Sequence, residues 1–172
     1  MKRLNSILLI DDDAPTLFLN KLVIQDLNCT DKILTAENGR QAIEMLTEES
    51  DDGFLCPDLI LLDINMPIVN GWEFMEKYET LSPEQKAKIV VVMLTTSLNP
   101  DDRSRAESIE DVKDFVSKPL DETTLKDIIE KHFKRFLIGQ DPRNLNQMWD
   151  QMYRSSLFYG GKGLPLWALS VV

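Results

Sequence analysis

A run of four apolar residues that ends in one carboxylate, Leu59–Asp63, most constrains how this chain can fold. The run follows a Pro57–Asp58 turn signal and carries no polar residue on either face. Strands of this kind are typical of parallel sheets that helices cover on both sides. Pro67 and Gly71 then mark a loop. Because chemistry in open α/β sheets gathers beyond the carboxyl ends of the strands, Asp63 is a candidate functional residue.

Strands and helices are expected to alternate along residues 1–138. Apolar runs predict further strands at 6–10, 32–36, 89–94 and 112–117, and helical periodicity predicts helices at about 13–27, 40–49, 71–81, 99–109 and from 121. Residues 51–53 are expected to be a loop. The pattern predicts an α/β fold with five parallel strands and five covering helices. The first helix is expected to present one apolar face with Leu17, Leu19, Leu22, Val23 and Leu27.

Four of the five expected strands end in polar functional groups, which are Asp11 and Asp12, then Asp63, Thr95 and Lys118. Helix capping explains an occasional Asp or Thr at such a place, but it does not explain the lysine or three consecutive aspartates. Carboxylates brought together repel one another, so we expect a cation between them. Oxygen ligands without a nearby His or thiolate favour Mg²⁺, with a backbone carbonyl just past Asp63 as a further ligand.

An ionised carboxylate beside a divalent cation and an ammonium group is suited to accept a phosphoryl group. In this interpretation Asp63 is the nucleophile. Mg²⁺ and Lys118 neutralise the oxygens of the transferring group, and Thr95 donates a hydrogen bond to one of them.

Four motifs in the same order resemble the receiver domain of two-component response regulators, of which the bacterial chemotaxis receiver is typical. They are Leu9–Asp13, Leu62–Gly71, Leu94–Ser97 and Phe115–Leu120, and the resemblance covers residues 4–137. It implies a flavodoxin-like sheet with strand order 2-1-3-4-5.

The resemblance also implies a role for each matching residue. Asp63 would be the phosphoacceptor, Asp12 a direct metal ligand, Asp11 a ligand through water, and Asn65 a ligand through its backbone carbonyl. Thr95 would be the switch hydroxyl, and Lys118 would pair with the phosphoryl group. A cis peptide is expected at Lys118–Pro119.

Switching would depend on Phe115, which takes the place of the family's switch aromatic residue. Phosphorylation of Asp63 would draw the Thr95 hydroxyl inward, and Phe115 would fill the vacated space and remodel the exposed face around it. An ordinary half-buried strand aromatic is the alternative interpretation of Phe115. Asn70 stands where the family often has Asp before the glycine, and no loss of function is expected from this change.

Two other functions compete for the same residues. A phosphatase of the haloacid dehalogenase type also uses an Asp nucleophile, but Pro15 stands where its motif requires Thr or Val. An interaction scaffold with the receiver fold and no phosphorylation is the other alternative, and the intact acceptor set disfavours it. His132, the only histidine, is expected to be a solvated side chain.

Residues 139–172 form a separate C-terminal appendage in this interpretation. An apolar stripe predicts a helix at about 143–155, followed by irregular chain and by no complete domain. Residues 136–172 resemble a fragment of the enolase superfamily, of the sugar-acid dehydratase type, without that family's catalytic residues. The apolar tail is expected to pack on the receiver, on a second copy in a homodimer, or on a missing partner.

Composition restricts the classes of partner. The net charge of −10 disfavours nonspecific binding to nucleic acid or anionic lipid. No apolar run is long enough to span a membrane, and the two isolated cysteines are expected to be reduced, so a cytoplasmic location is expected. The resemblance implies a phosphoryl donor, either a histidine kinase or a histidine phosphotransfer protein, and a downstream protein target. The chain would be a signalling receiver and not an enzyme.

Overall fold

Strands and helices alternate in the computed structural model, which describes residues 4–51, 53–87, 90–96 and 99–138. In chain order the elements are β1 (Leu4–Ile10), α1 (Ala14–Asp26), β2 (Thr30–Ala36), α2 (Gly39–Thr47), β3 (Glu49–Ser50), β4 (Gly53–Phe54), β5 (Leu59–Asp63), α3 (Gly71–Glu79), β6 (Val90–Thr95), α4 (Pro100–Ser108), β7 (Val112–Ser117) and α5 (Glu122–Ile138).

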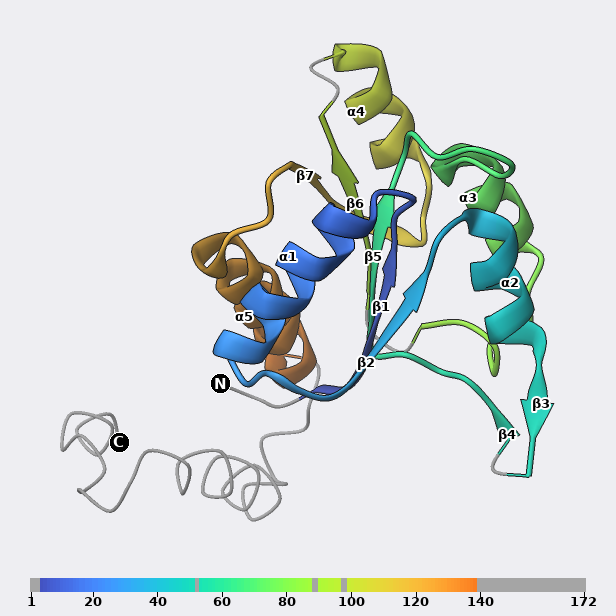
Figure 1. Ribbon diagram of the computed structural model, residues 1–172, viewed down its shortest axis with the longest axis horizontal. Helices are drawn as coiled ribbons and strands as arrows, with labels where there is room; N and C mark the ends of the chain where they lie inside the picture. The colour runs from blue at the N-terminus through green and yellow to red at the C-terminus, as the bar shows by residue number, and fades with distance from the viewer. Residues whose placement is uncertain (1–3, 52, 88–89, 97–98, 139–172) are drawn as a thin grey trace, which may run out of the picture.

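One five-stranded parallel sheet has the order β2-β1-β5-β6-β7. Counted along the strands of this sheet alone, the order is the expected 2-1-3-4-5, so the predicted fold class is confirmed. In Figure 1, α1 and α5 lie on one side of the sheet and α2 and α3 on the other. Ile10 pairs with Leu62 of β5, and Asp63 pairs with Leu94 of β6, so these strands end at the same edge.

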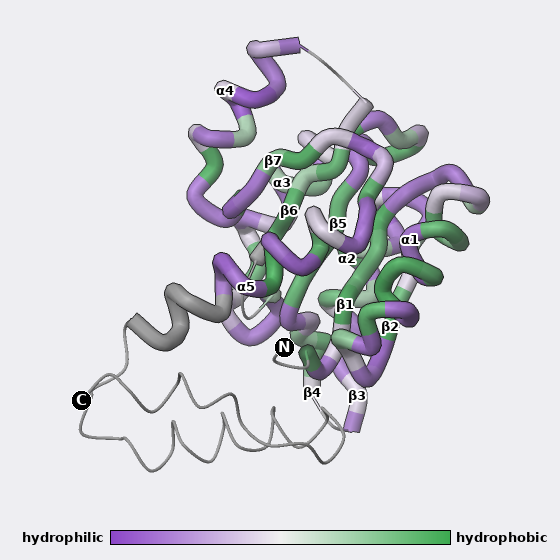
Figure 2. The backbone as a smooth tube through the Cα atoms, turned by 90° about the vertical axis from the view of Figure 1, so that its left-hand side faces the viewer, coloured by the Kyte–Doolittle hydropathy of each residue, from purple (hydrophilic) through white to green (hydrophobic). Residues whose placement is uncertain are grey.

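Two apolar layers hold the helices against the sheet. Leu8 and Ile10 of β1 pack with the α2 and α3 side, whereas Ile7 and Leu9 pack with the α1 and α5 side. This alternation is what a strand buried on both faces requires. Figure 2 shows the central strands as the most hydrophobic part of the chain. Burial of both faces explains why the sequence of β5 is apolar throughout its first four residues.

The buried face of α1 differs from the predicted one. Leu17 and Ile24 are buried together with Asn20, whereas Leu19 and Leu22 are 59% and 38% exposed, so their inward placement was wrong. The helix carries apolar residues around most of its circumference, and apolar spacing alone therefore does not select a face. Asp13 caps the helix, because its side chain accepts a hydrogen bond from the Thr16 N–H at 2.8 Å.

A short hairpin encloses the loop expected at residues 51–53, and Gly53 belongs to its second strand. Glu49 pairs with Phe54 and Ser50 with Gly53, which form the antiparallel strands β3 and β4. Gly53 has φ of +92°, in a region that residues with a Cβ rarely adopt. Two-residue strands give too short a pattern to be detected from alternation. The hairpin leads into β5, whose start is fixed by buried Asp58, which accepts hydrogen bonds from the Asn5 N–H and Nδ2 at 2.6 and 2.9 Å.

The predicted helix at 143–155 and the whole appendage 139–172 lie outside the described residues. Within the described part of the chain, no helix has the length and apolarity that crossing a membrane requires.

Candidate functional site

Charged side chains follow three strands at one edge of the sheet. Asp11 and Asp12 come directly after β1, Asp63 is the last residue of β5, and Lys118 comes directly after β7. The carboxyl ends of parallel strands meet at one edge, so the fold brings together residues that are up to 107 positions apart in sequence.

Three carboxylates meet at this edge. Asp11, Asp12 and Asp63 each present an oxygen within 4.8 Å of the others. The Asp11 and Asp63 side chains are almost fully buried, whereas Asp12 is exposed. The predicted cluster therefore has two members inside the protein and one at its opening.

The Lys118 ammonium group bridges the two buried carboxylates. Its Nζ lies 2.6 Å from Asp11 Oδ2 and 3.0 Å from Asp63 Oδ2, and the Lys118 side chain is only 14% exposed. The Lys118 backbone N–H donates to the Thr95 carbonyl at 2.8 Å, which holds the end of β7 against the end of β6. The peptide bond between Lys118 and Pro119 is cis, as predicted.

Burial and ion pairing act in opposite directions on these groups. Burial raises the pKa of Asp63 above its ordinary value, and its hydrogen bond with Lys118 only partly offsets this effect. Burial alone would lower the pKa of Lys118, but its hydrogen bonds with Asp11 and Asp63 outweigh burial and raise that pKa. Lys118 is therefore protonated. The ionised form of Asp63 is energetically unfavourable unless further positive charge lies close to its carboxylate.

The loop after β5 fixes the Asp63 side chain. Asp63 Oδ1 accepts a hydrogen bond from the Ile64 N–H at 2.8 Å, and the Asn65 N–H also donates to this carboxylate. The loop returns at Gly71, whose N–H donates to the Ile64 carbonyl at 2.9 Å. A Cβ on Gly71 would lie 2.5 Å from the Asp63 carbonyl oxygen, so only glycine allows α3 to start this close to the acceptor.

The helix after this loop has a complete N-terminal cap. The Asn70 side chain accepts from the N–H groups of Trp72 and Glu73, and the Glu73 side chain accepts from the Asn70 N–H. Asparagine therefore caps α3 where the family often has aspartate.

The donor set fits a hard divalent cation. Three carboxylates and one ammonium group leave two negative charges unbalanced in a partly buried site. All three donors are carboxylate oxygens, and among the described residues no His or Cys belongs to this cluster. Oxygen donors of this kind suit Mg²⁺, with Asp12 exposed to solvent that can complete the coordination shell.

Thr95 and Phe115 lie on the last two strands of the sheet, β6 and β7. Thr95 ends β6, is fully buried, and pairs with Ser117. Phe115 is half-buried on β7, and the Arg103 guanidinium of α4 lies 5.4 Å from the centre of its ring. A cavity of about 320 Å³ adjoins Phe115 between α4, β7 and Lys131 of α5. No sequence motif marked Arg103 as a neighbour of this ring.

Comparison with known proteins decides the family. Residues 7–130 match the response regulator receiver domain. The chain belongs to this family. This receiver is 32% identical over 133 residues to the probable methanogenesis regulatory protein FilR2 of Methanothrix harundinacea, which covers 77% of this chain and 83% of that protein. It is also similar to the crystal structure of a two-component response regulator from Cytophaga hutchinsonii, at 34% identity and a TM-score of 0.70, over 77% of this chain and 99% of that one.

A second, short similarity accompanies the receiver. A stretch of 45 residues is 47% identical to L-rhamnonate dehydratase of Saccharopolyspora erythraea, and it covers 26% of this chain and 12% of that protein. The match is in keeping with the expected likeness of the C-terminal segment to a sugar-acid dehydratase fragment. It spans too little of the dehydratase to carry that protein's activity to this receiver.

The environment of His132 corrects one expectation. Its side chain is only 5% exposed, and Nε2 lies 3.3 Å from Asp114 Oδ2 of β7, so the prediction of a solvated histidine was wrong. Asp114 also receives the Lys131 ammonium group at 2.7 Å. The amphipathic pattern of α5 placed apolar residues inward, and it gave no sign that a polar partner on β7 would hold a histidine there.

Proposed function

We propose that this receiver takes a phosphoryl group onto Asp63 from the phosphohistidine of a partner protein, in a reaction that depends on Mg²⁺. The observation that carries the proposal is the arrangement of Lys118 between the buried carboxylates of Asp11 and Asp63, with Asp12 exposed beside them. Receiver domains are signalling modules that work with a histidine kinase or a phosphotransfer protein, and family membership supports this class of donor.

In the proposed reaction an oxygen of the Asp63 carboxylate attacks the phosphorus atom. The bond between phosphorus and the histidine nitrogen breaks, the imidazole leaves, and an acyl phosphate forms on Asp63. Lys118 neutralises charge on the transferring group, and Thr95 donates its hydroxyl hydrogen to one phosphoryl oxygen.

Asp12, Asp63 and the Asn65 carbonyl would hold Mg²⁺, and Asp11 would act on it through water. When bound, the ion supplies positive charge that balances the phosphoryl oxygens and the acidic cluster. The raised pKa of Asp63 supports a need for this charge, because burial makes the free carboxylate costly.

The output of the proposed reaction is a change on the face formed by β6, α4 and β7. Thr95 is the last residue of β6, and Phe115 lies on the neighbouring strand β7, where its ring contacts Arg103 of α4. Movement of the Thr95 hydroxyl toward the phosphate would leave space for the Phe115 ring, which would then leave Arg103. An unidentified protein target would read this face.

We also propose that the chain has two parts. Residues 1–138 would form the receiver, and residues 139–172 would be an appendage that adds no catalytic group to it. A cytoplasmic location remains part of this proposal. Solution mass of the full chain and of a chain ending at Ile138 would test whether the appendage causes homodimerisation.

Incubation with acetyl phosphate and Mg²⁺ tests the central proposal, with intact-protein mass as the measurement. The wild type should gain one phosphoryl group, and Asp63→Asn should gain none. Asp13→Asn is the matched control, because Asp13 follows the same strand but caps α1 and should leave labelling intact. Equal absence of labelling in the wild type and Asp63→Asn would instead favour a scaffold that signals without phosphorylation.

A further inference from the structure

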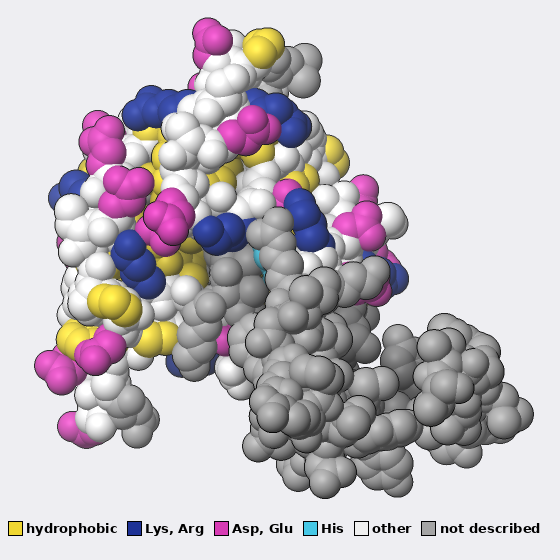
Figure 3. Space-filling model, turned by 180° about the vertical axis from the view of Figure 1, so that it is seen from behind, with side chains coloured by type: hydrophobic (Ala, Val, Ile, Leu, Met, Phe, Trp, Pro, Cys, Tyr) yellow, Lys and Arg dark blue, Asp and Glu magenta, His cyan; other side chains and the backbone are white. Residues whose placement is uncertain are grey.

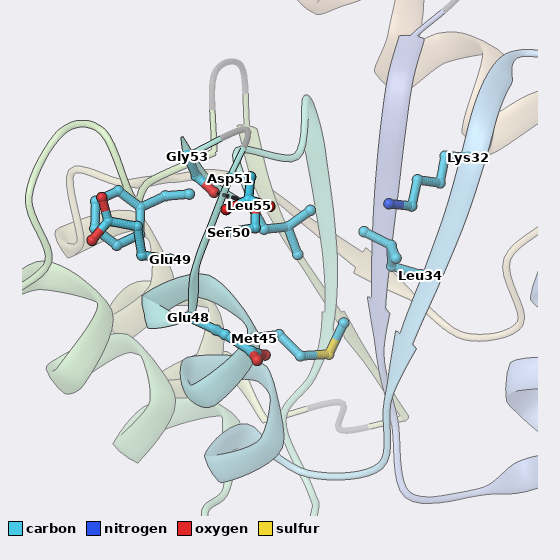
Figure 4. A pocket seen from close by; sticks show the side chains of 10 residues that line it. Lys32, Leu34, Met45, Glu48, Glu49, Ser50, Asp51, Gly53 and Leu55 are labelled. Carbon is cyan, nitrogen blue, oxygen red and sulfur yellow. Dashed lines mark hydrogen bonds between the residues drawn. The ribbon is translucent and has the colours of Figure 1, made fainter.

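An open groove lies between the edge of the sheet and the β3–β4 hairpin. It has a volume of about 920 Å³, and its walls come from β2, from the end of α2 and from the hairpin. Figure 4 shows the Leu34, Met45 and Leu55 side chains directed into this space from β2, from α2 and from the chain just after β4. All three side chains are half-buried. The groove therefore has an apolar floor that remains accessible from outside.

The groove runs beside a strand with a free side. Within the described sheet β2 pairs with β1 alone, and in the described part of the chain β3 and β4 pair only with each other. A free strand edge is where an extended peptide can add by backbone hydrogen bonds while its alternate side chains enter adjacent pockets. A hairpin of two-residue strands has little stability of its own, so an added segment between it and β2 would also support it.

Charge around the groove favours a basic occupant. Glu48, Glu49 and Asp51 line it as exposed carboxylates, and Lys32 of β2 is the one cation among its lining residues. In Figure 3 the hairpin end of the molecule, at the lower left, shows hydrophobic side chains next to acidic ones. A ligand that places apolar side chains on the floor and a Lys or Arg near the hairpin would match both features.

We propose that this groove binds an extended segment of a partner protein in which apolar residues are flanked by Lys or Arg. The segment would lie along β2, place its alternate apolar side chains against Leu34, Met45 and Leu55, and pair its basic ends with Glu49 and Asp51. Figure 1 shows the hairpin at the opposite end of the sheet from the loop that follows β5. This binding is therefore independent of phosphorylation at Asp63.

A peptide titration of the full ¹⁵N-labelled chain tests the proposal. The probe is an acetylated and amidated peptide of seven residues, the length of β2, that alternates Leu or Val with Thr and has Lys at both ends. The matched probe has Glu at both ends. The lysine peptide should shift the amide signals of residues 32–34, 49–51 and 53–55, and the glutamate peptide should bind much more weakly.

Charge reversal separates specific binding from general attraction to an acidic protein. The double variant Glu49→Lys/Asp51→Lys should weaken the lysine peptide by about tenfold, because two exposed ion pairs become repulsive. The double variant Asp127→Lys/Glu130→Lys is the control, since it changes the net charge by the same amount and both exposed residues lie on α5, on the other side of the sheet from α2. Both variants should still be labelled at Asp63 by acetyl phosphate.

Three results would overturn the proposal. The first is equal binding of the lysine and glutamate peptides. The second is equal weakening of the lysine peptide by the groove variant Glu49→Lys/Asp51→Lys and by the control variant Asp127→Lys/Glu130→Lys. The third is self-association of the chain that the groove variant abolishes, because this would make a second copy the occupant of the groove.

Discussion

Replacing Gly71 by alanine tests how tightly α3 is packed against the phosphoacceptor strand. The new Cβ would lie 2.5 Å from the Asp63 carbonyl oxygen and 2.8 Å from Ile64 Cα. Ordinary contact begins near 3.4 Å, so helix and strand must separate by about 0.9 Å. Both atoms belong to the backbone, and no side-chain rotation can relieve the overlap.

The expected loss of stability follows from two opposing terms. Overpacking costs about 3 kcal/mol at the upper end of its range, whereas alanine in a helix is favoured over glycine by up to about 1 kcal/mol. The free energy of unfolding should therefore fall by about 2 kcal/mol, which lowers Tm by roughly 7 °C for a domain of this size. Urea and thermal unfolding followed by circular dichroism measure both quantities. The rate of labelling by acetyl phosphate should also fall, because the displaced atoms belong to the acceptor loop.

Gly53→Ala is the matched control for this substitution. Gly53 has φ of +92°, but a Cβ there would meet no atom within 4 Å. The control should cost about 1 kcal/mol through backbone strain and leave labelling of Asp63 unchanged. A Gly71→Ala protein as stable as the wild type, or more stable, would refute the argument from close packing.

Three further predictions concern the same edge of the sheet. Burial raises the pKa of Asp63 in the folded protein above 3.8. At a pH above this folded-state pKa, the ionised carboxylate lowers the free energy of unfolding. This loss of stability disappears as the pH falls through that pKa. Without Mg²⁺ at neutral pH, Asp63→Asn should therefore unfold at a higher denaturant concentration than the wild type. The difference between the two unfolding midpoints should narrow in acid. A variant less stable than the wild type at neutral pH would contradict this prediction. Lys118→Met should cost about 3 kcal/mol in urea unfolding, because Asp11 and Asp63 lose their shared cation, and Mg²⁺ should reduce the loss. An unchanged midpoint would show that the bridge contributes nothing. Asn70→Ala should lower the free energy of unfolding by about 1 kcal/mol through loss of the cap, whereas Asn70→Asp should be about as stable as the wild type. Equal losses of stability in the two variants would mean that the cap is not the cause.

The charged cluster could be predicted because it depends on strand ends, which the sequence marks clearly. The apolar runs of β1 and β5 are buried on both faces, so their limits are visible, and the residue after such a run must lie at the edge of the sheet. The positions of Asp11 and Asp63 follow from this rule before any distance is known, whereas Lys118 follows the more exposed strand β7. The short separation between Lys118 and both carboxylates is a tertiary property that no local pattern contains.

Other features depended on packing partners and were missed for that reason. Leu19 and Leu22 are apolar but exposed, because α1 has more apolar residues than its contact with the sheet can cover. The buried His132 side chain lies next to the Asp114 carboxylate of β7. No local sequence pattern indicates that these two residues are neighbours. The β3–β4 hairpin was missed because strands of two residues have no measurable period.

The arrangement of the strands has a consequence for how such a chain can change over time. The carboxyl ends carry the charged cluster, while the hairpin enters β5 at its amino end, next to the Asp58 hydrogen bonds with Asn5. Insertions, deletions or exchanges in the hairpin would leave the lengths and register of the central strands intact. Evolution, or a protein engineer, could therefore replace the recognition properties of one end while inheriting the chemistry of the other without modification.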